Sequence, residues 1–166
     1  MAAGGELPDV EIDAWTPSAM QDAQRDAPDG MVAIEACGVD EDVDLALLAS
    51  SAAGLLPRAL AIRIEGCSVS SLAVCCPAAA ELTLAGGSLG AECRWSGDNW
   101  PSLTSLDLSG ASGWQAAAAG WASALPRLRR LALSGCDLDD DTLAAPASHA
   151  SAHCQKKGIR VVASWR

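Results

Sequence analysis

Seven cysteines, two histidines and a run of aspartates are the residues that could do chemistry in this 166-residue chain. His149 and His153 are four positions apart, a spacing that can chelate a metal on one helix face, and Cys154 follows them directly. The surrounding stretch is rich in alanine, and histidines near the end of such a helix interact favourably with its negative pole. We therefore expect solvated histidines here and predict no metal site.

Other candidate chemical motifs are incomplete. The aspartates at 137, 139, 140 and 141 lack the central glycine and terminal glutamate of a calcium hand, and a helix N-terminus accounts for such acids. The glycines at 86–90 come without the lysine of a phosphate loop, and no Gly-x-Ser-x-Gly sequence occurs. The sequence therefore predicts no catalytic residue and no cofactor, with an enzyme of unrecognised site as the alternative from another functional class.

The cysteines favour a reducing compartment. Their number is odd, no C-x-x-C pair occurs, and the N-terminus lacks the layout of a secretory signal. The apolar stretches are also too short and too interrupted to cross a bilayer. We expect reduced thiols, no direct membrane insertion and a cytoplasmic protein, with association to the cytoskeleton or an organelle possible.

One pattern recurs along the chain and predicts the strands that must position these residues. Two apolar residues stand on either side of one residue of any type, and a small residue or a cysteine comes three positions after the second apolar residue. The copies are Val32–Ile34, Ile62–Ile64, Leu82–Leu84, Leu106–Leu108, Leu131–Leu133 and Ile159–Val161. Their starts are 30, 20, 24, 25 and 28 residues apart, which is typical of a stacked repeat architecture. Each copy alternates as a half-buried strand does.

The residues between the copies predict turns and helices. Gly66, Gly110 and Gly135 end three of the strands, where the backbone must turn. The next position holds a small or compact residue, expected to point inward: Cys37, Cys67, Gly87, Ala111, Cys136 and Ser164. Helices are expected over 42–53, 70–76, 114–125 and 140–154, with an irregular connection at 90–100.

The pattern resembles the leucine-rich repeat family, in its cysteine-containing subtype. The stretch 131–140 followed by Leu143 is similar to that subtype's strand, cysteine, acidic cap and helix, and 67–77 repeats it as far as Cys76-Pro77. The resemblance implies an α/β solenoid with about six short parallel strands and helices on the convex side. A doubly wound parallel sheet is the competing fold, but its units need about 30 residues or more, so the shorter spacings argue against it.

Charge divides the chain into an acidic N-terminal arm or cap, residues 1–30, and a leucine-rich repeat domain, residues 31–166. Residues 1–55 carry twelve acidic side chains and one basic, a net charge of −11, whereas 56–166 carry nine acidic and ten basic, a net of +1. The first 30 residues either cover an open end of the solenoid or dock on a basic partner with Trp15 as anchor. The short basic clusters disfavour nucleic acid as a partner.

The open, concave face of the predicted sheet is the candidate binding site. Its predicted contact residues are Arg63, Glu65, Glu81, Thr83, Ser105, Asp107, Arg130, Ala132 and Arg160. The repeat spacing predicts one central row on this face, formed by Ala33, Arg63, Thr83, Asp107, Ala132 and Arg160. A floor of small residues allows a partner helix or loop to approach closely, and flanking charges set its register. Trp95 and Trp100, in the irregular connection, form a predicted secondary patch.

We interpret the sequence as a non-enzymatic protein-interaction module. The resemblance implies a structural or assembly subunit of a larger complex, cytoskeletal, axonemal or organellar. A substrate-recognition adaptor of a ubiquitin ligase is the alternative, although that role needs an adaptor-binding box for which residues 1–30 offer little room.

Overall fold

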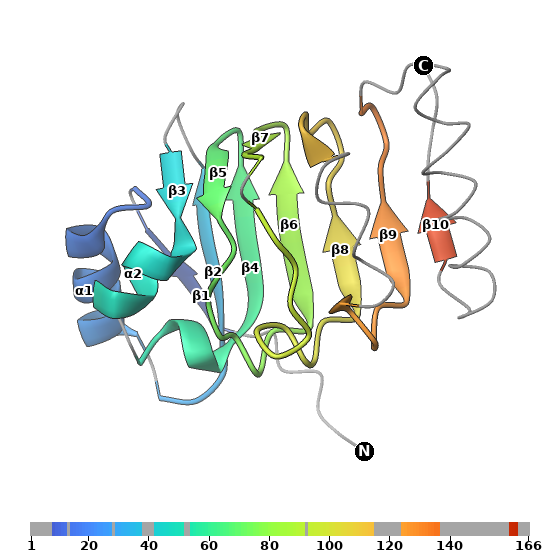
Figure 1. Cartoon of the computed structure of the whole chain (residues 1–166). Helices are drawn as coiled ribbons and strands as arrows, with labels where there is room; N and C mark the ends of the chain where they lie inside the picture. The colour runs from blue at the N-terminus through green and yellow to red at the C-terminus, as the bar shows by residue number, and fades with distance from the viewer. Residues whose placement is uncertain are drawn as a thin grey trace.

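A seven-stranded parallel sheet forms the backbone of the computed structural model, which describes residues 8–12, 14–27, 29–37, 42–51, 54–91, 93–114, 124–136 and 160–162. Its strands follow one another in chain order across the sheet (Figure 1). They are β1 (Asp9–Glu11), β2 (Val32–Cys37), β4 (Ala59–Glu65), β6 (Glu81–Ala85), β8 (Ser105–Asp107), β9 (Arg130–Ala132) and β10 (Arg160–Val162). The six predicted strand segments therefore lie side by side in one sheet, and β1 adds a seventh.

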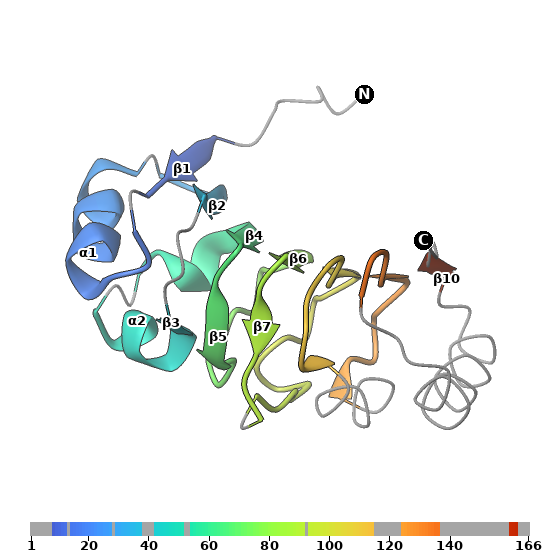
Figure 2. The same ribbon diagram turned by 90° about the horizontal axis from the view of Figure 1, so that it is seen from above.

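A second layer covers one side of this large sheet. It consists of a smaller parallel sheet, the helices and a short 3-10 turn: β3 (Asp42–Asp44), β5 (Ser68–Ser71), β7 (Ser88–Leu89), α1 (Pro17–Asp26), α2 (Leu45–Ser51) and η1 (Leu56–Arg58). Seen from above, the small sheet and α2 lie on the same side of the large sheet, and no described element covers the other side (Figure 2). We call this uncovered side the open face.

Alternating apolar residues build the core between the two layers. Ile34, Ile62, Leu82, Leu106 and Leu131 stand next to one another in the strand register, and each is almost completely buried. Successive side chains of a strand point to opposite faces, so the residues between them are directed to the open face. Each such aliphatic side chain contributes about 1.5–3 kcal/mol on burial, which makes this row a main source of stability.

Glycines align the turns that follow the strands. Four of them have a positive φ at the equivalent position, Gly66 (72°), Gly86 (68°), Gly110 (69°) and Gly135 (69°). The first three donate their N–H to the carbonyls of Ala85, Ser109 and Ser134 on the next strand's turn, at 2.8–2.9 Å. Glycine adopts this left-handed conformation without a steric cost, so the predicted turn glycines are confirmed and Gly86 joins them.

The position after the turn glycine must be small, as predicted, because successive turns lie in contact. A Cβ added to Gly87 would lie 1.8 Å from the Cys67 carbonyl oxygen. Cys67 itself is buried, and its neighbour Ser68 pairs with Ser88 in the small sheet. Two apolar residues that follow the small position, Val69 and Leu89, belong to this small sheet, whose strands were not predicted from the sequence.

The helix expected over 70–76 is wrong. Ser68–Ser71 is strand β5, and Leu72, Val74 and Cys76 are buried while Ala73 and Cys75 between them are exposed. This period of two is that of an extended chain. Part of the helix expected over 42–53 is confirmed as α2, whose start is capped by Asp44 Oδ1 accepting the Leu47 N–H at 3.1 Å. The helix expected over 140–154 lies outside the described residues, as does most of 114–125.

The segment before β2 is folded onto the rest of the chain. β1 pairs in parallel with β2, and α1 begins at the N-cap Thr16, whose hydroxyl oxygen accepts the Ala19 N–H. Met20 and Trp15 are buried in the core. Trp15 is therefore not an exposed anchor for a partner, and this expectation is corrected: its indole packs within its own chain. Neither α1 nor α2 is long enough for the roughly 20 apolar residues that a membrane span requires.

Candidate functional site

The open face carries two rows of side chains that run across the large sheet. The central row is Glu11, Glu35, Arg63, Thr83, Asp107 and Ala132, and the adjacent row is Asp9, Ala33, Ala61, Glu81, Ser105 and Arg130. In the backbone register, Val162 and Arg160 of β10 come next to Ala132 and Arg130. The predicted alignment of Arg63 with Thr83, Asp107 and Ala132 is confirmed. The two rows define the surface that a partner of this face would meet.

Arg160 does not continue the central row, as the sequence reasoning placed it. Arg160 pairs with Arg130 in the adjacent row, and Val162 stands beside Ala132. At the other end, Glu35 rather than Ala33 stands beside Arg63. A shift by two residues keeps every apolar side chain on the core face, so the alternating pattern alone does not distinguish the two registers.

The middle of the open face consists of short side chains. Thr83 and Ser105 are partly exposed, whereas Ala132 is buried and offers no more than a small surface to a partner. Asp107 uses its Oδ1 to accept the N–H of Ser109 at 2.9 Å, which fixes the turn after β8. The predicted surface of small residues therefore has little relief, and the Asp107 carboxylate on it already accepts a hydrogen bond from the backbone.

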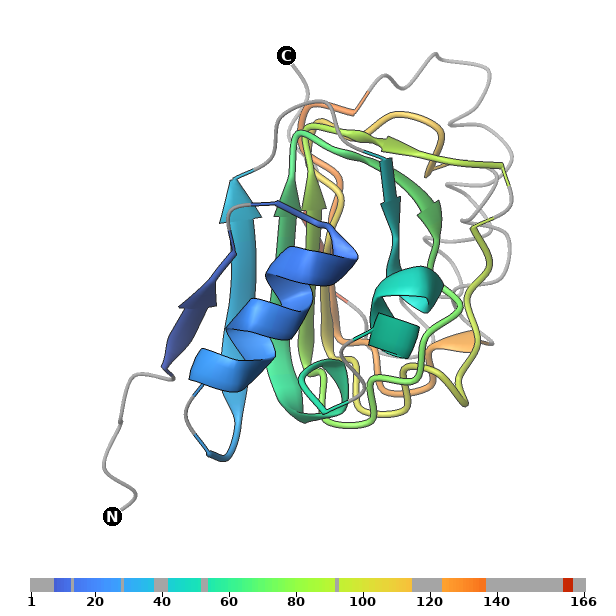
Figure 3. The ribbon, with the colours of Figure 1, turned by 90° about the vertical axis from the view of Figure 1, so that its left-hand side faces the viewer.

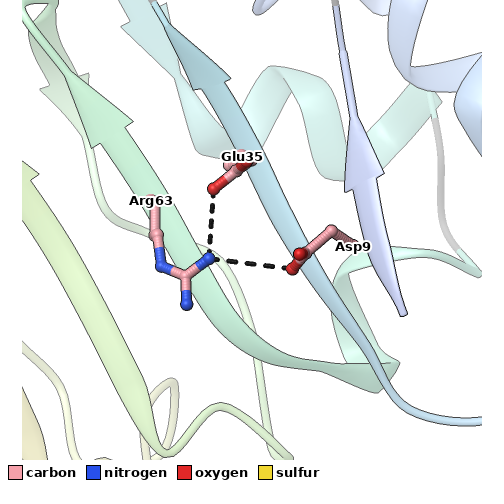
Figure 4. Close-up of polar contacts among 3 residues, drawn as sticks. All are labelled: Asp9, Glu35 and Arg63. Carbon is pink, nitrogen blue, oxygen red and sulfur yellow. Dashed lines mark hydrogen bonds and ion pairs between the residues drawn. The ribbon is translucent and has the colours of Figure 1, made fainter. Parts of the chain in front are cut away.

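Arg63 joins three strands through ion pairs (Figure 4). Its Nη1 lies 3.1 Å from Glu35 Oε2 on β2 and 3.7 Å from Asp9 Oδ1 on β1. The three side chains are about half exposed, and pairs of this kind contribute at most about 1 kcal/mol each. The guanidinium predicted to flank the binding face is therefore held by two carboxylates of its own chain.

Charge is unevenly distributed over the open face. The strands β1, β2, β4 and β6 bring together Asp9, Glu11, Glu35, Glu65 and Glu81, five acidic residues against the single Arg63. On β9 and just before it, Arg129 and Arg130 are exposed. The face is acidic at one end and basic at the other, which selects the orientation of a charged partner.

The tryptophan pair does not form a surface patch. Trp100 is 0 % exposed and Trp95 9 %, and their ring centroids are 6.5 Å apart in an edge-on arrangement. The Nε1–H of Trp100 donates to the Leu72 carbonyl at 3.2 Å. The predicted secondary patch is therefore corrected: these large apolar rings fill the core beneath the irregular connection.

Five of the cysteines are free thiols: Cys67, Cys75, Cys76, Cys93 and Cys136. Cys93 donates its S–H to the Val69 carbonyl at 3.1 Å, and Cys136 donates to that of Leu108 at 3.0 Å. Burial raises the pKa of Cys76 to about 12 and raises that of Cys93 as well. The thiol form of both is thereby favoured, and it is the thiolate that reacts.

No group of three or more metal-ligating side chains occurs in the part of the chain that the structure describes. The predicted candidates His149, His153 and Cys154, and the aspartates at 137–141, lie outside it.

A groove between β1 and α1 was not foreseen from the sequence. It has a volume of about 590 Å³ and is lined by Asp9–Ile12 of the strand side and, on the helix side, by Ala14, Thr16, Ser18, Ala19, Asp22, Ala23, Asp26 and Ala27. The available signals were Val10 and Ile12 alternating with acids, and Thr16-Pro17 as a helix start. We call it the β1–α1 groove.

The chain matches no known family model, no curated protein and no solved structure.

Proposed function

We propose that this chain is a leucine-rich repeat solenoid of the cysteine-containing subtype and serves as a non-enzymatic protein-binding module, a structural or assembly subunit of a larger complex. The observation that carries the proposal is the open face, where the side chains of parallel strands stand in unbroken rows beside a low, small-residue floor. The aligned turn glycines and the buried thiol positions support the repeat assignment.

The distribution of charge defines the partner that this face would bind. The carboxylates of β1, β2, β4 and β6 would attract a basic segment, and Arg129 and Arg130 would attract an acidic one. Such complementary charges govern orientation and association rate more than affinity, and salt weakens them. The free thiols fit a reducing compartment such as the cytosol, where we place the complex.

Affinity purification of the full chain from native extract tests this function. Wild type is compared with Glu81→Lys, a charge reversal on the open face, and with Asp98→Lys, the same reversal at an exposed site outside the large sheet. We expect one stoichiometric complex with wild type and Asp98→Lys and its loss with Glu81→Lys, while circular dichroism stays unchanged. Equal recovery of the complex by both variants would place the interface elsewhere.

A further inference from the structure

The outer edge of β1 pairs with no other described strand of the large sheet. Strand β1 is the first of the seven strands and pairs with β2 alone. On the side of β2, Ala33 donates to the Pro8 carbonyl and Ile12 donates to the Glu35 carbonyl. Alternate residues of a parallel strand bond to the same neighbour, so the backbone N–H and C=O groups of Asp9 and Glu11 face away from β2.

The residues that carry these outward-facing backbone groups, Asp9 and Glu11, line the β1–α1 groove. Helix α1 lies beside β1 at this end of the molecule (Figure 3), and both elements line the groove. None of the backbone hydrogen bonds between different described segments, apart from the β1–β2 ladder, involves Asp9 or Glu11. An exposed row of this kind is a ready template for one more strand.

The lining of the groove determines which strand would fit. On the helix side it presents the small side chains of Ala19, Ala23 and Ala27, while four carboxylates, those of Asp9, Glu11, Asp22 and Asp26, border it. None of the described residues that line it is basic. Among the described residues, Asp9 and Asp22 are paired with Arg63 and Arg25, whereas Glu11 and Asp26 have no ion-pair partner.

We propose that the β1 edge and the β1–α1 groove bind an extended basic segment of a partner protein by adding it to the large sheet as an eighth strand. Side chains of an added strand alternate between its two faces. Those on the open face would lie beside Asp9 and Glu11, where Lys or Arg is favoured, and those facing α1 would meet the alanines, where small apolar residues fit. The recognised pattern is thus basic and small apolar residues in alternation. This site shares the β1 carboxylates with the acidic end of the open face, but its backbone edge and groove are not part of the function proposed for that face.

A capped octapeptide of alternating lysine and valine is the probe, titrated against the full chain by fluorescence anisotropy. The first control peptide carries N-methyl groups on alternate residues, which removes backbone donors and keeps the charge. The second has the same composition in two blocks, Lys followed by Val. Since backbone pairing and alternation both contribute, we expect the alternating peptide to bind more tightly than either control.

Two double variants distinguish peptide binding in the groove from a general attraction of the basic peptide to an acidic protein. Glu11→Lys with Asp26→Lys reverses two groove carboxylates, and Asp29→Lys with Asp98→Lys makes the same change in charge at exposed residues outside the lining. We expect the first pair to weaken binding at least about tenfold, because like charges placed together cost several kcal/mol, and the second pair to have little effect.

Equal affinity for the N-methylated peptide, or equal weakening by both double variants, would overturn the proposal in favour of unspecific charge attraction. Self-association of the wild-type chain in sedimentation velocity, abolished by Glu11→Lys with Asp26→Lys, would also overturn it, because the occupant would then be a second copy. Loss of the native complex by Glu81→Lys together with full peptide binding would separate the two sites.

Discussion

Replacing Trp100 by phenylalanine tests whether the tryptophan pair belongs to the core. Trp100→Phe keeps an aromatic ring but removes the Nε1–H that donates to the Leu72 carbonyl at 3.2 Å. The matched control is Trp95→Phe, the same chemical change in the ring that Trp100 contacts. Among the described residues the buried Nε1 of Trp95 has no hydrogen-bond partner, so this control removes no hydrogen bond.

The expected difference in stability between the two variants follows from the hydrogen bonds that the Leu72 carbonyl accepts. The Leu72 carbonyl also accepts the Val74 N–H at 2.8 Å, so Trp100→Phe leaves it with one of its two bonds. The loss of one such bond costs about 0.5–1.5 kcal/mol. Both substitutions remove the same volume, so their difference in the free energy of unfolding should be about 1 kcal/mol. That corresponds to a Tm lower by roughly 2–4 °C for Trp100→Phe in a chain of this size.

Urea unfolding followed by far-UV circular dichroism measures this difference, since tryptophan fluorescence would change with the substitutions themselves. The slope m should be equal in the two variants, so that the midpoints report stability. Trp100→Ala should cost about 3–5 kcal/mol, the value for a fully buried large ring. A Trp95→Phe variant as unstable as Trp100→Phe would refute the hydrogen-bond argument, and a Trp100→Ala variant of unchanged midpoint would refute its burial.

Two further predictions concern the turns and the thiols. Gly87→Ala should destabilise the fold by about 1–3 kcal/mol or more in thermal unfolding, because its Cβ would overlap the Cys67 carbonyl; a midpoint equal to wild type would show that the turns are not in contact. Cys76 has a pKa of about 12 in the folded chain and near 9.0 as a free thiol, so its contribution is complete below pH 9 and is lost as pH rises toward 12. Urea midpoints should therefore fall across this range, with a slope of up to about 1.4 kcal/mol per pH unit from this thiol. The fall should be less steep in Cys76→Ala and only slightly reduced in Cys75→Ala, because Cys75 adds a smaller Coulombic contribution to the burial that raises the pKa of Cys76. Identical slopes in all three proteins would contradict this.

Much of the large sheet could be predicted because its information is local. Each copy of the pattern places two apolar residues on one face of a short strand, and in four of the six copies a turn glycine follows at a fixed distance. The small sheet was missed because each of its strands β3, β5 and β7 contributes a single buried apolar residue, Val43, Val69 or Leu89, so no apolar alternation marks it. The segment 70–76 combines apolar residues that fit either a helix or a strand, and contacts with neighbouring turns decide between them.

The tryptophans show a different limit of sequence reasoning. Nothing local distinguishes a buried indole in an irregular connection from an exposed one, because burial depends on what packs from elsewhere. Trp100 is buried through contacts that include Leu72, 28 positions earlier in the chain. Trp15 is likewise buried by packing that its acidic surroundings do not indicate.

The register of β2 and β10 has the largest consequence for function. With Ala33 beside Arg63, as the repeat spacing suggested, Arg63 would be an unpaired cation near the acidic end of the open face. The observed register places Glu35 there instead, and Asp9 of β1 adds a second carboxylate, so the cation is neutralised within the chain. The exposed positive charge described on this face then lies at β9 alone, and the acidic end continues without interruption to the β1 edge. A two-residue shift, which the apolar pattern does not reveal, thus converts a face with positive charge at both ends into one with a single direction of charge. The basic partner that we propose would therefore be attracted toward β1.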